Sequence, residues 1–242
     1  MAGKKKDNTT DKAMRALKEY ILSHGLRPGS PMPTENELVE QLEVSRSAVR
    51  EAMRTLSALD IVEVRHGIGT FVGTMSLRPL VEGLAFRGVL MPGDDLHALQ
   101  EVLEIRVALD LAAADEVVEA LAGTTNPDLA ELVDIMNAKC CSGDSFSLED
   151  RSFHTDLMDR TGKTLLGQLV AAFWDVHAVV SPSLGIPTPD DLIETAEAHG
   201  QMLTAAENGD VAAYREAVER HYGPLRRVIA AAAERASRPV AS

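Results

Sequence analysis

The sequence predicts a mainly α-helical protein built from two domains of different character. Hydrophobic residues make up 45% of its 242 residues, which is enough for a core in each of two domains. Aromatic residues contribute only 4%, and runs of alanine favour helical packing. In most of the chain the apolar residues recur every three or four positions, which is the spacing of one face of a helix.

The charge of the chain is divided unevenly, and this division also indicates two domains. The formal net charge is −13. Residues 1–73 carry 11 Lys and Arg against 10 Asp and Glu, whereas the remainder carries 13 against 27. The first part can therefore approach phosphate, and the acidic remainder should stay away from it. The expected parts are a flexible N-terminus at 1–9, a first domain at 10–73, a linker with a helix at 74–92, a helical domain at 93–236 and a tail at 237–242.

The first domain begins with two predicted helices. Asp11–His24 is amphipathic, and Gly25 ends it. Thr34 and Glu37 have the spacing of a capping box, which predicts a second helix that runs to about Leu42. The residues expected to face the core from the first helix are Met14, Leu17 and Ile21.

The segment Ser45–Leu59 predicts a third helix whose two faces differ in chemistry, with Ser45 as a suitable N-cap. The apolar face consists of Val49, Ala52, Met53 and Leu56. The opposite face carries Arg46, Arg50, Arg54 and Ser57. A short helix with an apolar back and three arginines on its front suits insertion into the major groove of DNA.

Two short strands are expected after the third helix. Ile61–Val64 and Thr70–Val72 have the composition of strands, and the glycines between them permit a tight turn at Arg65–Gly69. Three helices followed by a hairpin make a winged helix-turn-helix, with the hairpin as the wing.

A resemblance to a known family covers about residues 10–73. The chain reads PTENELVEQLEVSRSAVREAMRTL and then HGIGTFV, and it resembles the N-terminal domain of the GntR family of bacterial transcription regulators. The resemblance implies base and phosphate contacts at the start of the third helix and contacts near the minor groove at the wing tip. The residues so implied are Ser45, Arg46, Ser47, Arg50, His66 and Gly67. Where the family commonly has an arginine that contacts the DNA backbone, this chain has Asn36, so we expect a shallower salt dependence of binding.

The second part of the chain predicts an all-α bundle of about seven helices. A linker helix is expected at Ser76–Leu90, and six further amphipathic segments follow, separated by proline and glycine. Their expected limits are Asp94–Leu121, Pro127–Cys141, Leu148–Thr161, Lys163–Val180, Pro189–Asn208 and Asp210–Arg235.

The predicted bundle places polar side chains on faces that should be buried. Asp150 and His154 lie one turn apart and point the same way. His199 and His221 each occupy a place in an apolar stripe of a later helix. Unpaired polar groups in a core each cost kilocalories, so a shared partner is expected. Three imidazoles and a carboxylate suit a divalent transition metal such as zinc, nickel or manganese.

A second resemblance covers about residues 78–235. The run DRSFH, which contains Asp150 and His154, together with the later His199 and His221, resembles the FCD effector domain of the FadR-type branch of GntR regulators. The seven-helix count favours that subgroup over the six-helix one. The resemblance implies that the four residues are metal ligands and that Arg106 faces a carboxylate effector.

Three inward residues on two helices also matter for the bundle. Arg106 and Asp110 form an i,i+4 pair on the inward face of the first long segment. His177 follows Val170 and Phe173 on one stripe, and it either contacts the effector or serves the core and the metal ligands.

The favoured interpretation is a cytoplasmic, ligand-responsive transcription regulator. A homodimer would present two arginine-bearing helices to a pseudo-palindromic operator in double-stranded DNA. A small organic acid would reach the metal and shift the equilibrium between dimer geometries. We expect its binding to relieve repression of the regulated genes, and activation is the alternative. No apolar run of membrane-spanning length is expected, and the adjacent Cys140 and Cys141 favour a reducing compartment.

Two other interpretations use the same residues. In one, the metal is purely structural, and the effector binds elsewhere or does not exist. In the other, a metal-bound water makes the protein a hydrolase. The chain has no His-Glu-x-x-His pair, no nucleophile elbow and no glycine-rich phosphate loop, so we expect a regulator without catalytic residues.

Overall fold

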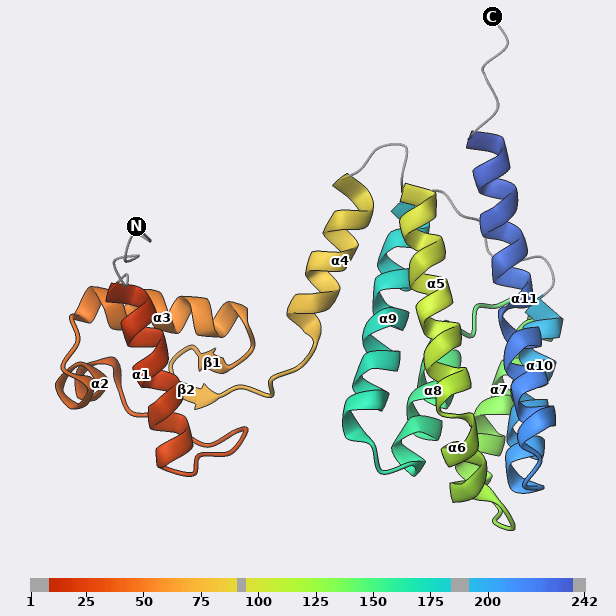
Figure 1. Cartoon of the computed structure of the whole chain (residues 1–242), viewed down its shortest axis with the longest axis horizontal. Helices are drawn as coiled ribbons and strands as arrows, with labels where there is room; N and C mark the ends of the chain where they lie inside the picture. The colour runs from red at the N-terminus through yellow and green to blue at the C-terminus, as the bar shows by residue number, and fades with distance from the viewer. Residues whose placement is uncertain (1–8, 91–94, 184–191, 237–242) are drawn as a thin grey trace, which may run out of the picture. The chain divides into compact units, whose positions relative to one another are not determined.

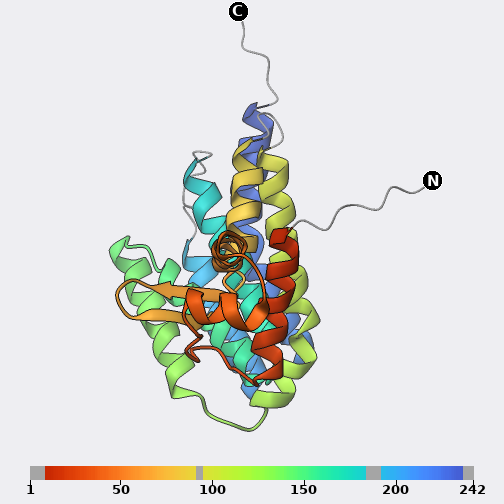
Figure 2. The ribbon, with the colours of Figure 1, turned by 90° about the vertical axis from the view of Figure 1, so that its left-hand side faces the viewer.

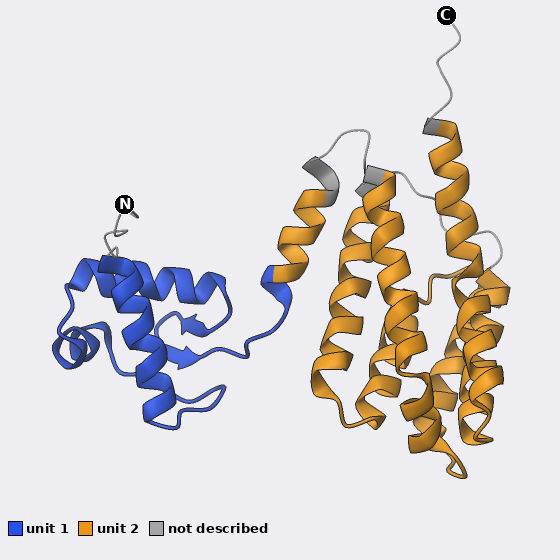
Figure 3. Cartoon of the chain, viewed as in Figure 1, with its two compact units in different colours: residues 1–79 blue, residues 80–242 orange. Residues whose placement is uncertain are grey.

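The computed structural model describes residues 9–90, 95–183 and 192–236. The predicted flexible N-terminus, apart from residue 9, and the predicted tail lie outside the described residues. The chain separates into two compact units, residues 1–79 and residues 80–242, which Figure 3 shows in different colours. Each unit has its own cluster of buried apolar side chains.

Unit 1 is a winged helix-turn-helix (Figures 1 and 2). Its elements are α1 (Thr9–Ser23), α2 (Glu35–Leu42), α3 (Arg46–Ala58), β1 (Val62–Arg65) and β2 (Gly69–Val72). The capping box is present: the Thr34 side chain accepts from the Glu37 amide, and the Glu37 carboxylate accepts from the Thr34 amide. Ser45 caps α3 by accepting from the amide of Ala48. Local sequence therefore sets where both helices begin.

The core of unit 1 lies between α1, α3 and the hairpin. The predicted apolar face of α3 is buried, because none of its four side chains is more than 4% exposed. Leu17 and Ile21 of α1 pack in the same cluster, and Val62 pairs with Val72 across the antiparallel hairpin. Burial of one face of α3 leaves its arginines exposed on the other.

The exit from unit 1 depends on Gly73. Its amide donates to the carbonyl of Ile61 at 2.9 Å, so the chain passes close to the backbone of Asp60. A Cβ at position 73 would lie 2.2 Å from the Asp60 carbonyl oxygen. The Asp60 carboxylate then accepts from the Thr74 hydroxyl and the Ser76 amide. Hydrogen bonding to the Ser76 side chain, then to the Ser76 amide and to Thr74, lowers the pKa of Asp60. Only glycine fits this crossing without a shift of the backbone.

Gly73→Ala is therefore expected to lower the free energy of unfolding of unit 1 by about 1–3 kcal/mol, the usual cost of forcing extra atoms into a packed site. Gly83→Ala is the control of opposite sign. Gly83 is an exposed helical position with open space around its Cβ, so alanine should be neutral or stabilise by about 0.5–1 kcal/mol. Denaturant unfolding followed by circular dichroism measures both, and equal stability of the two variants would contradict the close approach.

Unit 2 is an all-α bundle, as predicted. Its helices are α4 (Arg78–Leu90, which starts at the end of unit 1), α5 (Asp95–Ala112), α6 (Ala114–Leu121), α7 (Pro127–Ser142), α8 (Ser147–Arg160), α9 (Thr164–Ser183), α10 (Leu192–Glu207) and α11 (Val211–Ala236). In Figure 1, α10 and α11 run side by side, and α5 packs against both α9 and α11. Helix α8 packs between α7 and α9. This arrangement brings α5, α8, α10 and α11 around one core.

One predicted helix is two helices. The segment expected as Asp94–Leu121 bends at Ala113, so the described residues of the bundle contain eight helices with α4, rather than seven. The backbone hydrogen bonds continue on either side, from Ala113 to Leu109 and from Val117 to Ala113. The apolar stripe also continues through the bend, which explains why periodicity alone did not reveal it. The bend lets α6 pack on α10 and α11.

Helix α9 corrects the expectation that no apolar run has membrane-spanning length. Thr164–Pro182 has a mean hydropathy of 1.3 and is long and apolar enough, by length and composition only, to cross a membrane. In the structure this helix packs against α5 and α8, and its buried residues Val170, Val176 and Val180 belong to the core of unit 2. The bundle therefore explains part of its apolar composition, since 33% of this stretch is buried inside the structure.

Candidate functional site

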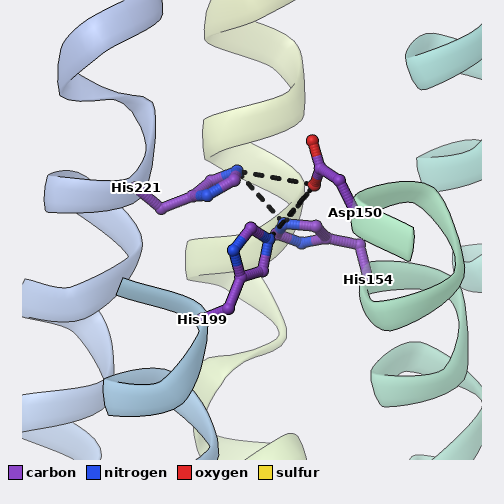
Figure 4. A group of neighbouring side chains, drawn as sticks. All are labelled: Asp150, His154, His199 and His221. Atoms are coloured by element: carbon purple, nitrogen blue, oxygen red, sulfur yellow. Dashed lines mark hydrogen bonds and ion pairs between the residues drawn. The ribbon is translucent and has the colours of Figure 1, made fainter. Parts of the chain in front are cut away.

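Four potential metal ligands converge in the core of unit 2 (Figure 4). Asp150 and His154 come from one face of α8, His199 from α10 and His221 from α11. One donor atom from each lies within 4.8 Å of all the others. The structure thus brings together the four side chains that the sequence analysis selected.

The distances suit a common ion. The Asp150 Oδ1 atom lies 3.3 Å from His154 Nε2, 3.2 Å from His199 Nε2 and 3.9 Å from His221 Nε2. The Nε2 atoms of His154 and His221 are 3.1 Å apart. Ligands bound at about 2.0–2.1 Å in a tetrahedral zinc site would be about 3.3 Å apart. The histidines are at most 4% exposed, so this cluster can hold a divalent metal away from bulk water.

The pKa values of the four residues in the cluster are strongly shifted. Burial acts to raise the pKa of Asp150, but hydrogen bonds with His154 and His199 outweigh it and hold that pKa well below its usual range. Burial acts to lower the pKa of His154, but the carboxylates of Asp110 and Asp150 raise it to about 9. Burial lowers the pKa values of His199 and His221, and for His221 the neighbouring imidazoles lower it further. An ionised carboxylate beside the neutral imidazoles of His199 and His221 is a suitable donor set for a metal, and a bound metal would displace the proton of His154.

Residues behind the ligands orient their rings. His199 Nδ1 lies 2.8 Å from the carbonyl oxygen of Thr195. His154 Nδ1 lies 3.0 Å from Asp110 Oδ2, and the Tyr222 hydroxyl donates to the same oxygen at 2.6 Å. Asp110 was expected to pair with Arg106, so this part of the prediction was wrong. The inward position of Asp110 was visible in the sequence, but its partners come from α8 and α11, which periodicity does not locate.

A cavity of about 280 Å³ opens beside the cluster. Asp150 and His221 form part of its wall, and both predicted effector residues, Arg106 and His177, line it as well. The other lining residues are Ser145, Phe146, Ser147, Trp174, Ala178, Ser181, Pro182, Leu192, Thr195, Tyr222 and Leu225. A larger hollow of about 640 Å³ between α7, α10 and α11 contains none of the four potential ligands, so the smaller cavity is the relevant one.

The two predicted effector residues differ in their surroundings. The Arg106 side chain is 4% exposed, and its guanidinium carbon lies 5.3 Å from the centre of the Tyr222 ring. His177 is half-buried, and its ring nitrogens lie 3.3 Å from the Ser181 hydroxyl. Burial, followed by the charge of Arg106, lowers the pKa of His177 to about 3. The cavity therefore has a buried cation and a neutral imidazole in its wall.

The predicted DNA-contacting residues are all exposed on unit 1. Ser45, Arg46, Ser47 and Arg50 lie at the start of α3, and His66 and Gly67 lie in the turn between β1 and β2. Two contacts were not foreseen from the sequence. Arg46 Nη2 donates to Asn36 Oδ1 at 2.7 Å, and Arg50 Nε lies 3.3 Å from Glu35 Oε2. The first turn of α2 therefore orients the two arginines.

Comparisons with known proteins cover both units. The family model described as "Bacterial regulatory proteins, gntR family" matches residues 9–72, and the model of the FCD domain matches residues 101–223. A putative transcriptional regulatory protein, NedR of Micromonospora viridifaciens, is 40% identical over 107 residues, which are 44% of this chain and 77% of that protein. The galactonate operon transcriptional repressor of Escherichia coli (strain K12) is 24% identical over 206 residues, which are 84% of this chain and 89% of that protein.

A solved structure described as Streptococcus agalactiae GntR is also similar. It has a TM-score of 0.66 and 26% sequence identity over 90% of this chain and 99% of that one. These relatives are transcription regulators and not enzymes. With a winged helix-turn-helix matched by the first model and half of the chain matched by the second, the chain belongs to the GntR family of bacterial DNA-binding transcription regulators and carries an FCD domain.

Proposed function

We propose that this regulator is a metal-containing repressor of the FadR-type subgroup that releases its operator when a small carboxylate binds in unit 2. The observation that carries the proposal is the shared wall of the cavity. Asp150 and His221 belong to both the four-donor cluster and the cavity, and Arg106 lies in the same wall. A bound metal would supply a Lewis-acidic site for an oxygen of the ligand, with zinc, nickel or manganese as candidates.

The charge of the ligand follows from Arg106. This side chain is almost fully buried, and among the described residues no carboxylate forms an ion pair with it. A buried guanidinium strongly favours an anionic partner, and a carboxylate matches its planar donors. The name of the Escherichia coli relative links that protein to galactonate, itself a carboxylate, and to repression. We therefore propose that Arg106 binds the carboxylate of the effector and that His177 contacts the polar groups in the rest of the effector.

The DNA-binding part of the proposal uses the exposed face of unit 1. We assign the six residues at the start of α3 and in the wing turn to operator contacts, with residues 10–73 as the DNA-binding domain, 74–92 as the linker and 93–236 as the effector domain. A homodimer would match a pseudo-palindromic operator with its two copies of α3. A protein with this task acts where the chromosome lies, in the bacterial cytoplasm.

A purely structural metal is the second candidate. The observation that favours it is the burial of the cluster, since its three histidines are at most 4% exposed among core residues. In that case the metal would stabilise the bundle and would not take part in effector binding.

The proposal is tested by titrating the full, zinc-loaded chain with galactonate and with the neutral analogue galactitol. The operator is first selected from random DNA. Trp174, the single tryptophan, lines the cavity and reports occupancy by fluorescence. Galactonate should change this fluorescence and weaken operator binding, and galactitol should do neither. If a panel of hydroxy acids changes neither quantity, a structural metal is favoured.

Arg106→Gln is expected to weaken acid binding by about 10–100-fold, because a hydrogen bond to a charged group contributes about 1.5–3 kcal/mol. Zinc content should not change. Arg151→Gln is the matched control, since Arg151 pairs with Asp175 and is not among the residues that line the cavity. Equal acid affinities of the two variants in a fluorescence titration would remove Arg106 from the effector site.

A further inference from the structure

Asp110 is a buried carboxylate that is not one of the four potential ligands. Its side chain is 0% exposed, and it lies on α5, whereas the potential ligands come from α8, α10 and α11. An ionised carboxylate without partners costs several kilocalories in such a place. Its Oδ2 atom has two neighbours, His154 Nδ1 at 3.0 Å and the Tyr222 hydroxyl at 2.6 Å.

The geometry of His154 shows what this contact does. The ring presents Nδ1 to Asp110 and Nε2 to the cluster, where Asp150 Oδ1 is 3.3 Å away. A metal-bound imidazole carries its proton on the nitrogen that faces away from the metal. A carboxylate at Nδ1 therefore favours the form of His154 whose Nε2 lone pair points to the metal position.

The three histidines differ in the group that lies nearest to Nδ1. His199 has a backbone carbonyl at Nδ1, and His154 has a carboxylate. Among the described residues neither His154 Nδ1 nor His221 Nδ1 makes a well-aligned hydrogen bond, but His154 Nδ1 lies within ion-pair distance of Asp110 Oδ2, at 3.0 Å. Among the described residues, His154 is thus the potential ligand whose Nδ1 atom lies beside a carboxyl side chain that can be changed by mutation.

We propose that Asp110 is a positioning residue for the metal ligand His154, and that Tyr222 holds Asp110 in place. The inference rests on the metal of the proposed function, but it does not depend on an effector. Asp110 would fix the orientation of the imidazole and make Nε2 a stronger donor, as outer carboxylates do behind histidine ligands. Tyr222 also lines the cavity and contacts Arg106. The Asp110–Tyr222 pair therefore connects the metal site with the cavity wall that contains Arg106.

The first test is the zinc affinity of the full chain, measured by competition with a chelating dye. Asp110→Asn should weaken zinc binding by about 10–100-fold, the usual effect of losing such an outer partner. Tyr222→Phe should weaken it less, because the carboxylate remains. Asp175→Asn is the matched control, since Asp175 pairs with Arg151 and does not contact the cluster residues. Its zinc affinity should equal that of the unmodified chain.

The second test reads the ring of His154 directly, by nitrogen-15 NMR of histidine-labelled, zinc-loaded protein. The unmodified chain should show His154 bound through Nε2, with a hydrogen-bonded proton on Nδ1 that Asp110→Asn shifts. A merely structural role for Asp110 would lower thermal stability and leave the zinc affinity and the His154 spectrum unchanged. That result would overturn the proposal.

A variant that does not fold would leave the test intact. If Asp110→Asn does not fold, the spectra of the unmodified chain and of Tyr222→Phe decide. Binding of zinc through Nδ1 of His154, or a His154 signal that Tyr222→Phe does not move, overturns the proposal. Failure of the proposed function looks different: zinc would bind with the expected dependence on Asp110, while no carboxylic acid changes operator binding.

Discussion

His199→Ala and His221→Ala should each weaken zinc binding by roughly 100-fold or more. Structural zinc sites with four ligands contribute about 10–16 kcal/mol, so one ligand accounts for about 3 kcal/mol, and each 1.4 kcal/mol is a factor of ten. Both rings come from helices outside α8, so either change leaves an incomplete donor set at the centre of the bundle. Metal analysis of dialysed, untagged protein and chelator competition measure the effect.

The same variants separate the regulatory metal from the structural one. Zinc at about a thousand times its dissociation constant stabilises the folded state by about 4 kcal/mol, so both variants should lose zinc-dependent thermal stabilisation. Loss of metal and stability with an unchanged effector response would favour a purely structural role. His97→Ala is the matched control, because His97 is an exposed residue of α5. Zinc binding as tight in His199→Ala as in this control would exclude the proposed ligand.

The second large effect is expected in unit 1. Arg46→Ala and Arg50→Ala should each weaken specific operator binding by about 1–3 kcal/mol, the usual contribution of a good arginine–base contact. Both side chains are exposed at the start of α3 and are oriented by α2 through Asn36 and Glu35. Fluorescence anisotropy with the selected operator measures the affinity. Arg220→Ala removes the same charge from unit 2 and should have no effect. Unchanged affinity in both α3 variants would disprove the assignment.

Asn36 extends this prediction to the salt dependence. Its oxygen accepts from Arg46 at 2.7 Å, so it orients an arginine that we propose to contact DNA, at a position where the family commonly has an arginine of its own. Asn36→Arg should add a phosphate contact and steepen the logarithmic salt dependence by about 0.9. It should also release Arg46 and lower discrimination between operator and random DNA. An unchanged slope in anisotropy titrations at several salt concentrations would contradict a phosphate contact from position 36.

Much of the fold and the choice of candidate ligands followed from local sequence. The caps at Thr34 and Ser45 and the apolar face of α3 are properties of residues within one turn of each other. The same holds for the inward direction of Asp150 and His154 on α8, and periodicity also placed His199 and His221 on buried faces of their helices. These predictions were accurate because helical geometry alone fixes which residues share a face.

Contacts between helices were decided only by the tertiary structure. Sequence showed that Asp110 faces inward, but packing of α5 against α11 gave it Tyr222 and His154 in place of Arg106. The bend at Ala113 and the contact of Arg46 with Asn36 were also invisible to periodicity. Periodicity records the direction of a side chain from its own helix, whereas its partner depends on how separate helices pack. The sequence by itself therefore determined the winged helix-turn-helix, the helical bundle and the inward faces of the four donors. Packing of separate helices decided that the donors meet and which residues support them.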